Sequence, residues 1–474
     1  MAQARLQYLD DDDKGALHEQ TMRVLAQAGV AFNVPEAIDL LAEAGARVDR
    51  ERLVAYLPEE LVQAALAITP REVLLAARDP AHDVVVGGGH PLSVCSDGTA
   101  TYLLDDETGE RLPGSAERLR VVMRLLDALE QCDYVWPSLS ARDLDAATAN
   151  LEIEYLSLTE CAKHLQDEVR GPEFVAPLVD LLEAVAGAPL KERPIFSSIN
   201  CTVAPLQHDA DMTRATLGLA RAGVPIVVMP MPLMGTTAPA SVMGNCVVTM
   251  AEILSTVVLL QLAAPGCALI AAPEPGVADL RSGGYLCGPP EADLASLASI
   301  EMCRSYGLPS QVEGLGGDAR YPDLQEGAEG VSAALLGALV GADSMVGFGT
   351  LDGAESFSLA DAVLDDDLMA GVRRYLGETA VDDAATLVDD IIAIGPGGHF
   401  LGRRSTREAA RAGVLWSPSV LRRGHTQGDP RALVAEAADR AADIIANHRA
   451  APLADDVVRY VEDVIARYRA VCTR

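Results

Sequence analysis

The sequence predicts an α/β protein built around a (β/α)8 TIM barrel, with helical and β-rich additions before the barrel and helices after it. Three observations favour this fold. The chain has 474 residues and is 49% apolar, which suffices for a large core. From about residue 115, short apolar runs alternate with helical runs. No glycine-rich dinucleotide motif opens any of these units, which disfavours an open doubly wound sheet.

The first 114 residues read as an N-terminal extension with two parts. Residues 15–70 carry three helical patterns, and the third starts beside Pro58, a residue suited to a first helical turn. Residues 71–112 change to short strand-like runs, broken at Gly87–Gly89. We therefore expect a small helical unit followed by a β-rich region.

The central region, residues 115–425, has the alternation of a barrel. Its candidate strands are 134–137, 194–199, 224–230, 268–271, 311–314 and 343–348. Its candidate helices are 115–130, 209–222, 240–264, 291–306, 325–341 and 359–377. Short apolar strands separated by helices are typical of parallel strands buried on both faces.

The C-terminal tail, residues 426–474, carries two further helical patterns. We expect these helices to pack on the barrel or to take part in a dimer.

The charge balance excludes some classes of partner. Acidic residues number 69 against 37 basic ones, for a net charge of −32. Nucleic acid and anionic membrane surfaces need clustered Lys and Arg, so neither is expected as a partner. A small cation would be attracted by such a field. An acidic surface that serves only solubility, or reflects genome composition, is the stronger alternative reading.

The cysteines and apolar runs indicate a protein of the cytoplasm. Nine cysteines occur without any C-x-x-C pair, as expected for free thiols in a reducing compartment. The start of the chain has no apolar signal core. The long apolar run 247–264 contains Glu252 and is interpreted as a buried helix, not as a membrane span.

Chemistry in a barrel is expected in the loops after the strand ends, and these include 164–166 and 395–404. One late loop is rich in suitable groups. Asp318 and Asp323 follow a short apolar run, and Gln325 opens the next helix. Paired carboxylates can act as acid and base, whereas acids at a helix start can equally be solvated N-terminal residues. Glu252, inside an apolar helix, fits a site residue or a packing network equally well.

Aromatic residues are scarce, at 4% of the chain. Trp136, Tyr321 and Phe348 fall at predicted strand ends or loops, where they could form a cage for a quaternary ammonium group. Core packing is the commoner role for each. No H-x-x-x-H, H-E-x-x-H or G-x-S-x-G motif occurs, so neither a metal site nor a serine hydrolase is predicted. The glycine run at 395–398 could donate amides to an anion or form a plain turn.

These motifs, in their order and spacing, resemble the trimethylamine methyltransferase family, chiefly its branch without pyrrolysine. The D-A-R-x-x-D-x-Q pattern resembles the loop that holds pyrrolysine in archaeal members, with Leu324 at the corresponding position. The resemblance runs along nearly the whole chain, through His18–Gly29, Gly87–Gly89, Thr159–His164, Gly288–Glu291, Tyr306–Pro309, Asp318–Gln325 and Gly395–Gly398.

Membership of this family implies a (β/α)8 barrel that moves a methyl group from a methylated amine to the cobalt(I) of a corrinoid carried by a partner protein. A quaternary ammonium already has a good leaving group, a neutral tertiary amine. Trimethylamine would need activation, the role attributed to pyrrolysine, which Leu324 cannot perform. The resemblance therefore favours quaternary amines such as glycine betaine, carnitine or proline betaine.

The resemblance also implies a set of site residues. The catalytic loop would consist of Asp318, Asp323, Leu324 and Gln325, and the substrate would contact His164, Glu252, Tyr321 and Phe348. Gly397 and Gly398 would let the corrinoid approach closely, and no bound metal is expected. The chain departs from the family at Arg320, where Lys is common, and at Ser405, where a His usually precedes the Thr.

Two other functions stay open at this point. The late carboxylates could serve a lyase or isomerase barrel as acid and base. Alternatively, the barrel could bind betaine without turnover, which the missing histidine before Thr406 would favour.

Overall fold

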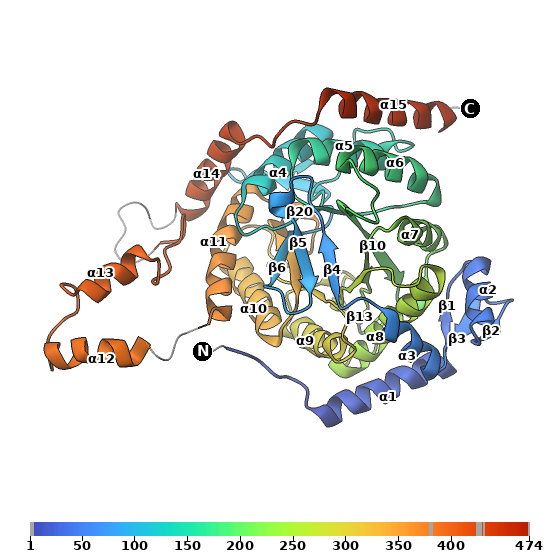
Figure 1. Cartoon of the computed structure of the whole chain (residues 1–474), viewed down its shortest axis with the longest axis horizontal. Coiled ribbons are helices and arrows are strands. Elements are labelled where there is room, and N and C mark those ends of the chain that lie inside the picture. The colour runs from blue at the N-terminus through green and yellow to red at the C-terminus, as the bar shows by residue number, and fades with distance from the viewer. Residues whose placement is uncertain (1–3, 379–382, 423–428, 430–431, 473–474) are drawn as a thin grey trace.

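A closed barrel of short parallel strands forms the centre of the molecule, in a computed structural model that describes residues 4–378, 383–422, 429 and 432–472 (Figure 1). Every neighbouring pair is joined by parallel pairing, and the last strand pairs with the first. In order, the strands are β6 (Ser93–Ser96), the segment 134–136, β9 (Leu165–Glu168), β10 (Phe196–Val203), β12 (Ile226–Met229), β14 (Leu269–Ala271), β17 (Gln311–Glu313) and β18 (Ser344–Phe348). These eight segments confirm the predicted (β/α)8 barrel.

Helices surround the barrel (Figure 1). Their ends follow local capping chemistry: the side chains of Ser115, Ser241 and Asp323 accept backbone N–H groups at helix starts, and Gly341 ends a helix in the left-handed conformation. The helices are α4 (Ala116–Ala128), α5 (Ala149–Glu160), α6 (Val175–Ala186), α7 (Ala210–Ala222), α8 (Val242–Ala263), α9 (Pro290–Ser305), α10 (Leu324–Val340) and α11 (Leu359–Leu376).

Helix α8 is long and apolar enough to cross a membrane by length and composition alone. In the structure it is a core helix, because 78% of its most apolar window is buried inside the protein. It packs against α9 and against α1 (Asp11–Gln27) and α3 (Glu59–Ile68) of the N-terminal extension. The sequence-based interpretation of this run as a buried helix is confirmed.

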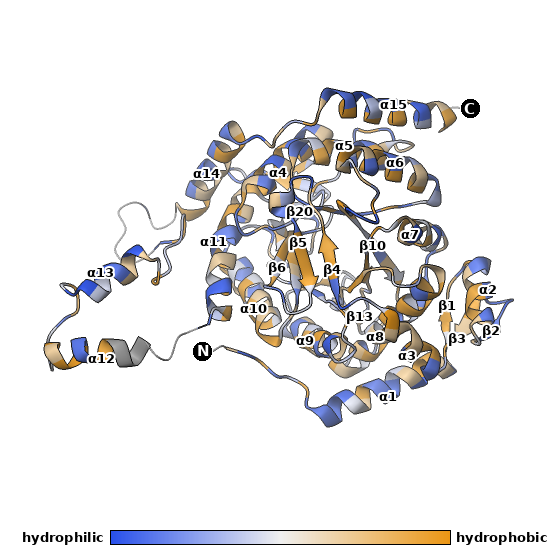
Figure 2. Cartoon of the chain, viewed as in Figure 1, coloured by the Kyte–Doolittle hydropathy of each residue, from blue (hydrophilic) through white to orange (hydrophobic). Residues whose placement is uncertain are grey.

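One end of the barrel is closed by a hairpin of β4 (Glu72–Leu75) and β5 (Val84–Gly87). Val73, Leu75 and Val86 are fully or almost fully buried and join the core cluster of the barrel interior. Figure 2 shows the hairpin as an apolar element lying across the barrel. Since Ala76 after β4 bonds to Pro194 before β10, the hairpin covers the end where the strands begin.

The other end, where the strands finish, carries two small sheets. One consists of β7 (Tyr102–Leu104), β8 (Arg111–Pro113), β19 (Thr350–Leu351) and β20 (Ser356–Phe357). The other consists of β13 (Leu233–Met234), β15 (Gly276–Ala278) and β16 (Tyr285–Leu286). All these strands lie in connections that leave the barrel strands at their carboxyl ends, so the small sheets build a rim around the opening.

The remaining elements lie outside the barrel (Figure 1). In the N-terminal extension, β1 (Val30–Ala31) pairs with β11 (Gln207–His208) beyond the end of β10, and β2 (Arg47–Asp49), β3 (Val54–Tyr56) and α2 (Pro35–Glu43) complete the unit. Helices α12 (Asp383–Ile394) and α13 (Arg404–Arg411) project from the body, whereas α14 (Leu433–Asn447) and α15 (Asp455–Cys472) pack along it.

Three segments differ from the sequence-based expectation. The first barrel strand, β6, lies inside the segment assigned to the extension, before residue 115. Residues 164–166, expected in a loop, lead into and form part of β9, whose polar sequence hid it. The segment 395–404 follows α12 and not a barrel strand. The expected boundary between residues 425 and 426 lies outside the described residues.

Candidate active site

A cavity of about 200 Å³ lies at the open end of the barrel. Residues just inside or after the barrel strands line it, among them Val346 of β18 and Met229 of β12. The turn between β19 and β20 supplies Gly353 and Ala354. The volume is below the roughly 300 Å³ at which pockets for drug-sized ligands begin, so the cavity suits a very small molecule.

Four carboxyl groups line this cavity, each supplied by the end of a different barrel strand. Asp97 follows β6, Glu168 ends β9, Glu274 follows β14 and Glu313 ends β17. Only closure of the barrel brings them together, since they are far apart in the sequence. Such a ring of acids gives the cavity an anionic character.

The acids perturb one another because water is largely excluded from them. Burial raises the pKa of Glu313 well above its ordinary value, and the charges of Asp97 and Glu274 raise it further. Burial also raises the pKa of Glu274 and of Asp97. Glu274 is 3% exposed, and its Oε1 has no hydrogen-bond partner in the described structure. A cationic ligand in the cavity would favour the charged form of these acids and so lower their pKa values.

Two aromatic rings complete the lining. Trp136 stands against Gly98, and its Nε1 donates a hydrogen bond of 2.8 Å to the carboxylate of Asp167. Tyr285 of β16 packs so closely on Gly276 that a Cβ there would lie 2.4 Å from the ring. Aromatic faces beside carboxylates are the surroundings that proteins use for ammonium groups.

Two thiols also line the cavity, and both are backed by carboxylates. The Sγ of Cys201 donates to Glu168 at 3.2 Å, and the Sγ of Cys287 donates to Asp318 at 3.4 Å. Burial and the adjacent negative charge raise the pKa of each thiol well above its ordinary value. Both therefore stay protonated and are poor nucleophiles.

Of the residues in the predicted catalytic loop, Asp318 contacts the cavity wall. Its carboxylate accepts the backbone N–H groups of Cys287 and Gly288, each at 3.0 Å. Asp323 caps α10, and Gln325 donates to Glu329 at 2.8 Å. Leu324 begins α10 and is 88% exposed, outside the set of cavity-lining residues.

The predicted substrate contacts are distributed through the fold and do not line the cavity. His164 bonds to Ala76 and Ser197 near the closed end, and burial lowers its pKa to about 4. Glu252 accepts from Thr202 and from the backbone of Leu206, while Phe348 is fully buried in the main core.

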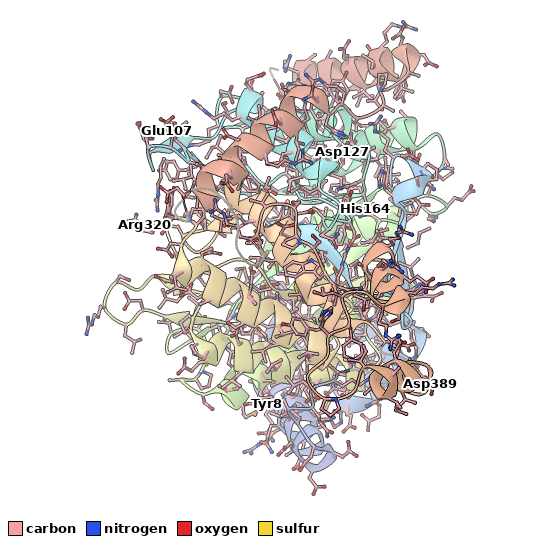
Figure 3. All side chains as sticks on the ribbon, turned by 90° about the vertical axis from the view of Figure 1, so that its left-hand side faces the viewer. Tyr8, Glu107, Asp127, His164, Arg320 and Asp389 are labelled. Carbon is pink, nitrogen blue, oxygen red and sulfur yellow. The ribbon has the colours of Figure 1, made fainter. Side chains whose placement is uncertain are left out.

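Tyr321 belongs to the barrel rim, whereas the predicted corrinoid glycines lie beyond α12. Tyr321 lies in the same rim loop as Arg320. Its hydroxyl donates a hydrogen bond of 3.1 Å to the backbone carbonyl of Asp106. Figure 3 shows Arg320 at one edge and Asp389 of α12 at the other. Gly397 and Gly398 follow α12 directly and are exposed. The functional roles assigned to these residues stay predictions.

Sequence reasoning missed the four acids of the ring and Tyr285, although it noted Trp136 as a strand-end aromatic. A usable signal was present. Asp97, Glu168, Glu274 and Glu313 each stand at or within three residues of the end of a barrel strand, where barrel enzymes carry their chemistry. Within the described part of the chain, no group of three or more His, Cys, Asp or Glu is arranged to hold a metal ion.

Comparisons with known proteins identify the family. The trimethylamine methyltransferase (MTTB) family model matches residues 2–472. Trimethylamine methyltransferase MttB of Methanosarcina barkeri is 30% identical over 465 residues, covering 96% of this chain and 93% of the relative. Glycine betaine methyltransferase of Desulfitobacterium hafniense is 28% identical over 414 residues, covering 84% of each chain.

A solved structure shares the fold. The monomethylamine methyltransferase MtmB of Methanosarcina barkeri superposes with a TM-score of 0.56 at 13% identity, covering 93% of this chain and 89% of that one. The barrel fold and the family match thus define a methyltransferase built on a TIM barrel. The chain belongs to the trimethylamine methyltransferase family and is a methyltransferase of the methylamine or betaine type.

Proposed function

We propose that this protein transfers a methyl group from a quaternary amine to the cobalt(I) corrinoid of a partner protein. The observation that carries the proposal is the cavity, where four carboxyl groups and two aromatic rings surround a space of about 200 Å³. A permanent cation gains from both kinds of group, with cation–π contacts worth about 0.5–2 kcal/mol each. The nine cysteines are all free thiols, in keeping with a reducing cytoplasm, the setting that cobalt(I) requires.

The residues of the cavity would bind and orient the donor. The carboxylates of Asp97, Glu168, Glu274 and Glu313 hold the ammonium charge, while Trp136 and Tyr285 limit how its methyl groups can turn. Orientation of this kind is a large part of catalysis when no proton has to move. The protonated thiols of Cys201 and Cys287 do not compete for the methyl group.

The loops at the mouth of the barrel expose several apolar side chains, against which a corrinoid ring could pack. These include Met231, Leu280, Tyr321 and Leu324. When bound there, the corrinoid supplies the nucleophile that accepts the methyl group, and the amine leaves as a neutral molecule. The protein itself would exclude water and present one methyl group toward the opening.

The test is methyl transfer by the purified protein to cob(I)alamin from a panel of quaternary amines, followed by the absorbance of methylcobalamin. We expect turnover with at least one quaternary amine. Replacement of two acids together, Glu274→Gln with Glu313→Gln, should raise the KM of the donor at least tenfold, or about 1.4 kcal/mol.

The matched control is Glu462→Gln, which neutralises an exposed acid of α15 far from the cavity. It should leave KM unchanged. Absence of methylcobalamin with every quaternary amine, or equal effects of the double variant and the control, would contradict the proposal.

A further inference from the structure

Four acids line the cavity. Among the described residues that line it, none is Lys, Arg or His. Resting on the function proposed above, we propose that the methyl donor is a quaternary ammonium compound with a neutral, hydroxyl-bearing tail, of the choline type, and not a betaine with a carboxylate. The inference names the chemical class of the substrate.

Because the cavity is small, the charge on the tail of the methyl donor affects binding. In glycine betaine a single carbon separates the ammonium nitrogen from the carboxylate, so a cavity of about 200 Å³ receives both ends together. The carboxylate would then face Asp97, Glu168, Glu274 and Glu313 without a cation to balance it. Like charges brought together in a site with little water are strongly unfavourable.

Two arginines of the rim, Arg111 and Arg320, are paired elsewhere. Arg111 forms ion pairs with Asp352 and Glu355, and its guanidinium lies 5.6 Å from the ring centroid of Tyr102. Arg320 pairs with the same Asp352 at 3.4 Å, and its side chain is 75% exposed. Figure 3 shows Arg320 at the outer edge of the molecule. Neither arginine lines the cavity, so neither is placed to neutralise a substrate carboxylate inside it.

The cavity does offer a partner for a hydroxyl group. Glu274 is 97% buried, because only 3% of its surface is exposed, and its Oε1 lacks a hydrogen-bond partner in the described structure. A buried acceptor left unpaired costs about 1–3 kcal/mol, and a hydroxyl donor from the ligand would recover that cost. The hydroxyl of a choline-type tail can donate a hydrogen bond to this oxygen, whereas a carboxylate tail has no proton to donate.

The direct test is calorimetric binding of choline, tetramethylammonium and glycine betaine to the full chain, without any corrinoid. We expect choline to bind at least tenfold more tightly than glycine betaine. Equal or tighter binding of glycine betaine would overturn the inference. Methyl transfer from betaines alone would also overturn it and leave the proposed function intact. Tight choline binding without any methyl transfer would refute the proposed function instead.

Proton linkage gives a second readout. The titratable groups that face the ligand are Asp97, Glu168, Glu274, Glu313 and Tyr285 with the two thiols Cys201 and Cys287. Burial raises the pKa of Asp97, Glu274 and Glu313, so a pure cation must displace protons from them. Choline affinity should therefore rise as pH rises through the pKa values of these acids, and the observed binding enthalpy should vary with the ionisation enthalpy of the buffer. Choline affinity that does not rise with pH would overturn the inference.

A variant isolates the hydroxyl contact. Glu274→Met keeps much of the side-chain shape and removes both charge and acceptor. This variant should bind both choline and tetramethylammonium more weakly and should lose the preference for choline over tetramethylammonium. The comparison of the three ligands on the unmodified protein stands even if this variant fails to fold. A Glu274→Met protein that folds and still prefers choline would contradict the role given to Glu274.

Discussion

At the scale of single residues, the orientation of Trp136 depends on a carboxyl pair outside the cavity. Its indole Nε1 donates to Asp167, which lies beside Glu154 of α5. Burial raises the pKa of Asp167 to about 6 and raises that of Glu154 well above its ordinary value, and the hydrogen bond between them makes the protonation of each depend on the other. Asp167 therefore fixes the orientation of Trp136, which lines the cavity, although Asp167 itself does not line it.

Substitution of Asp167 tests this arrangement. Asp167→Leu leaves a buried indole N–H without an acceptor, which should cost about 1–3 kcal/mol of stability and weaken donor binding. Asp167→Asn keeps an acceptor oxygen and should retain binding. The chain has two tryptophans, so in a Trp416→Phe background the fluorescence reports Trp136 alone. The Trp136 fluorescence should change with a midpoint near pH 6, and this change should be absent in Asp167→Asn. A pH-dependent change that persists in Asp167→Asn would refute the link between Trp136 and Asp167.

At the scale of elements, the hairpin of β15 and β16 places Tyr285 because Gly276 leaves room for it. A Cβ at position 276 would lie 2.4 Å from the Tyr285 ring and 2.8 Å from Leu233, closer than side chains can pack. Gly276→Ala should therefore move the ring and raise the donor KM severalfold, with kcat less affected. The control is Gly15→Ala in α1, where a Cβ would meet nothing within 4 Å. Equal KM values for both variants would contradict the prediction.

Helices α10 and α11 enclose a second group of acids behind the cavity wall, where Glu326 lies against the cavity-lining Gly317. Glu326 is buried with both oxygens lacking a hydrogen-bond partner among the described residues, and Asp361 and Asp365 lie on the adjoining helix. Burial, followed by the neighbouring acids, raises the pKa of Glu326 to about 10 and that of Asp361 to about 8. The packing of these helices thus favours protonated carboxyl groups.

The sign of the pH effect follows from these raised pKa values. The folded chain binds these protons more tightly than the unfolded chain does, so stability should fall as pH rises from 5 toward 9. Glu326→Gln removes one such group and should stabilise the protein at pH 8 by at least about 1 kcal/mol, the equivalent of about one pKa unit. Denaturant unfolding at pH 5 and 8 measures the difference. A variant that is less stable than the parent at pH 8 would contradict it.

The helices were predictable because their signals are local. The run expected at 209–222 became α7 (Ala210–Ala222), and the run at 325–341 became α10 (Leu324–Val340), each with capping residues in the sequence. Strand β9 was missed because Gln166 and Glu168 occupy the face that would normally be apolar. Period-based detection fails where function makes the inner face of a strand polar.

At the scale of the whole molecule, the family resemblance was sound, but the sequence alone does not show which strand-end residues meet. The acid ring is assembled from β6, β9, β14 and β17, so a strand-end position marks each acid as a candidate and only the closed barrel groups the four. The late loop drew attention because Asp318 and Asp323 are close in sequence, yet Asp323 serves as a helix cap. Proximity along the chain was a poor guide, since closure of the barrel decides which groups meet.

The plugged end of the barrel has a kinetic consequence. Because Val73, Leu75 and Val86 fill that end, the donor and its demethylated product can pass only through the open end of the barrel. The partner protein of the proposed function would dock at the same end. The donor has to enter first, and the spent amine can depart only after the partner separates. Initial-rate measurements should reveal a compulsory order of addition, with inhibition at high partner concentration. A random order would mean that the cavity has another exit.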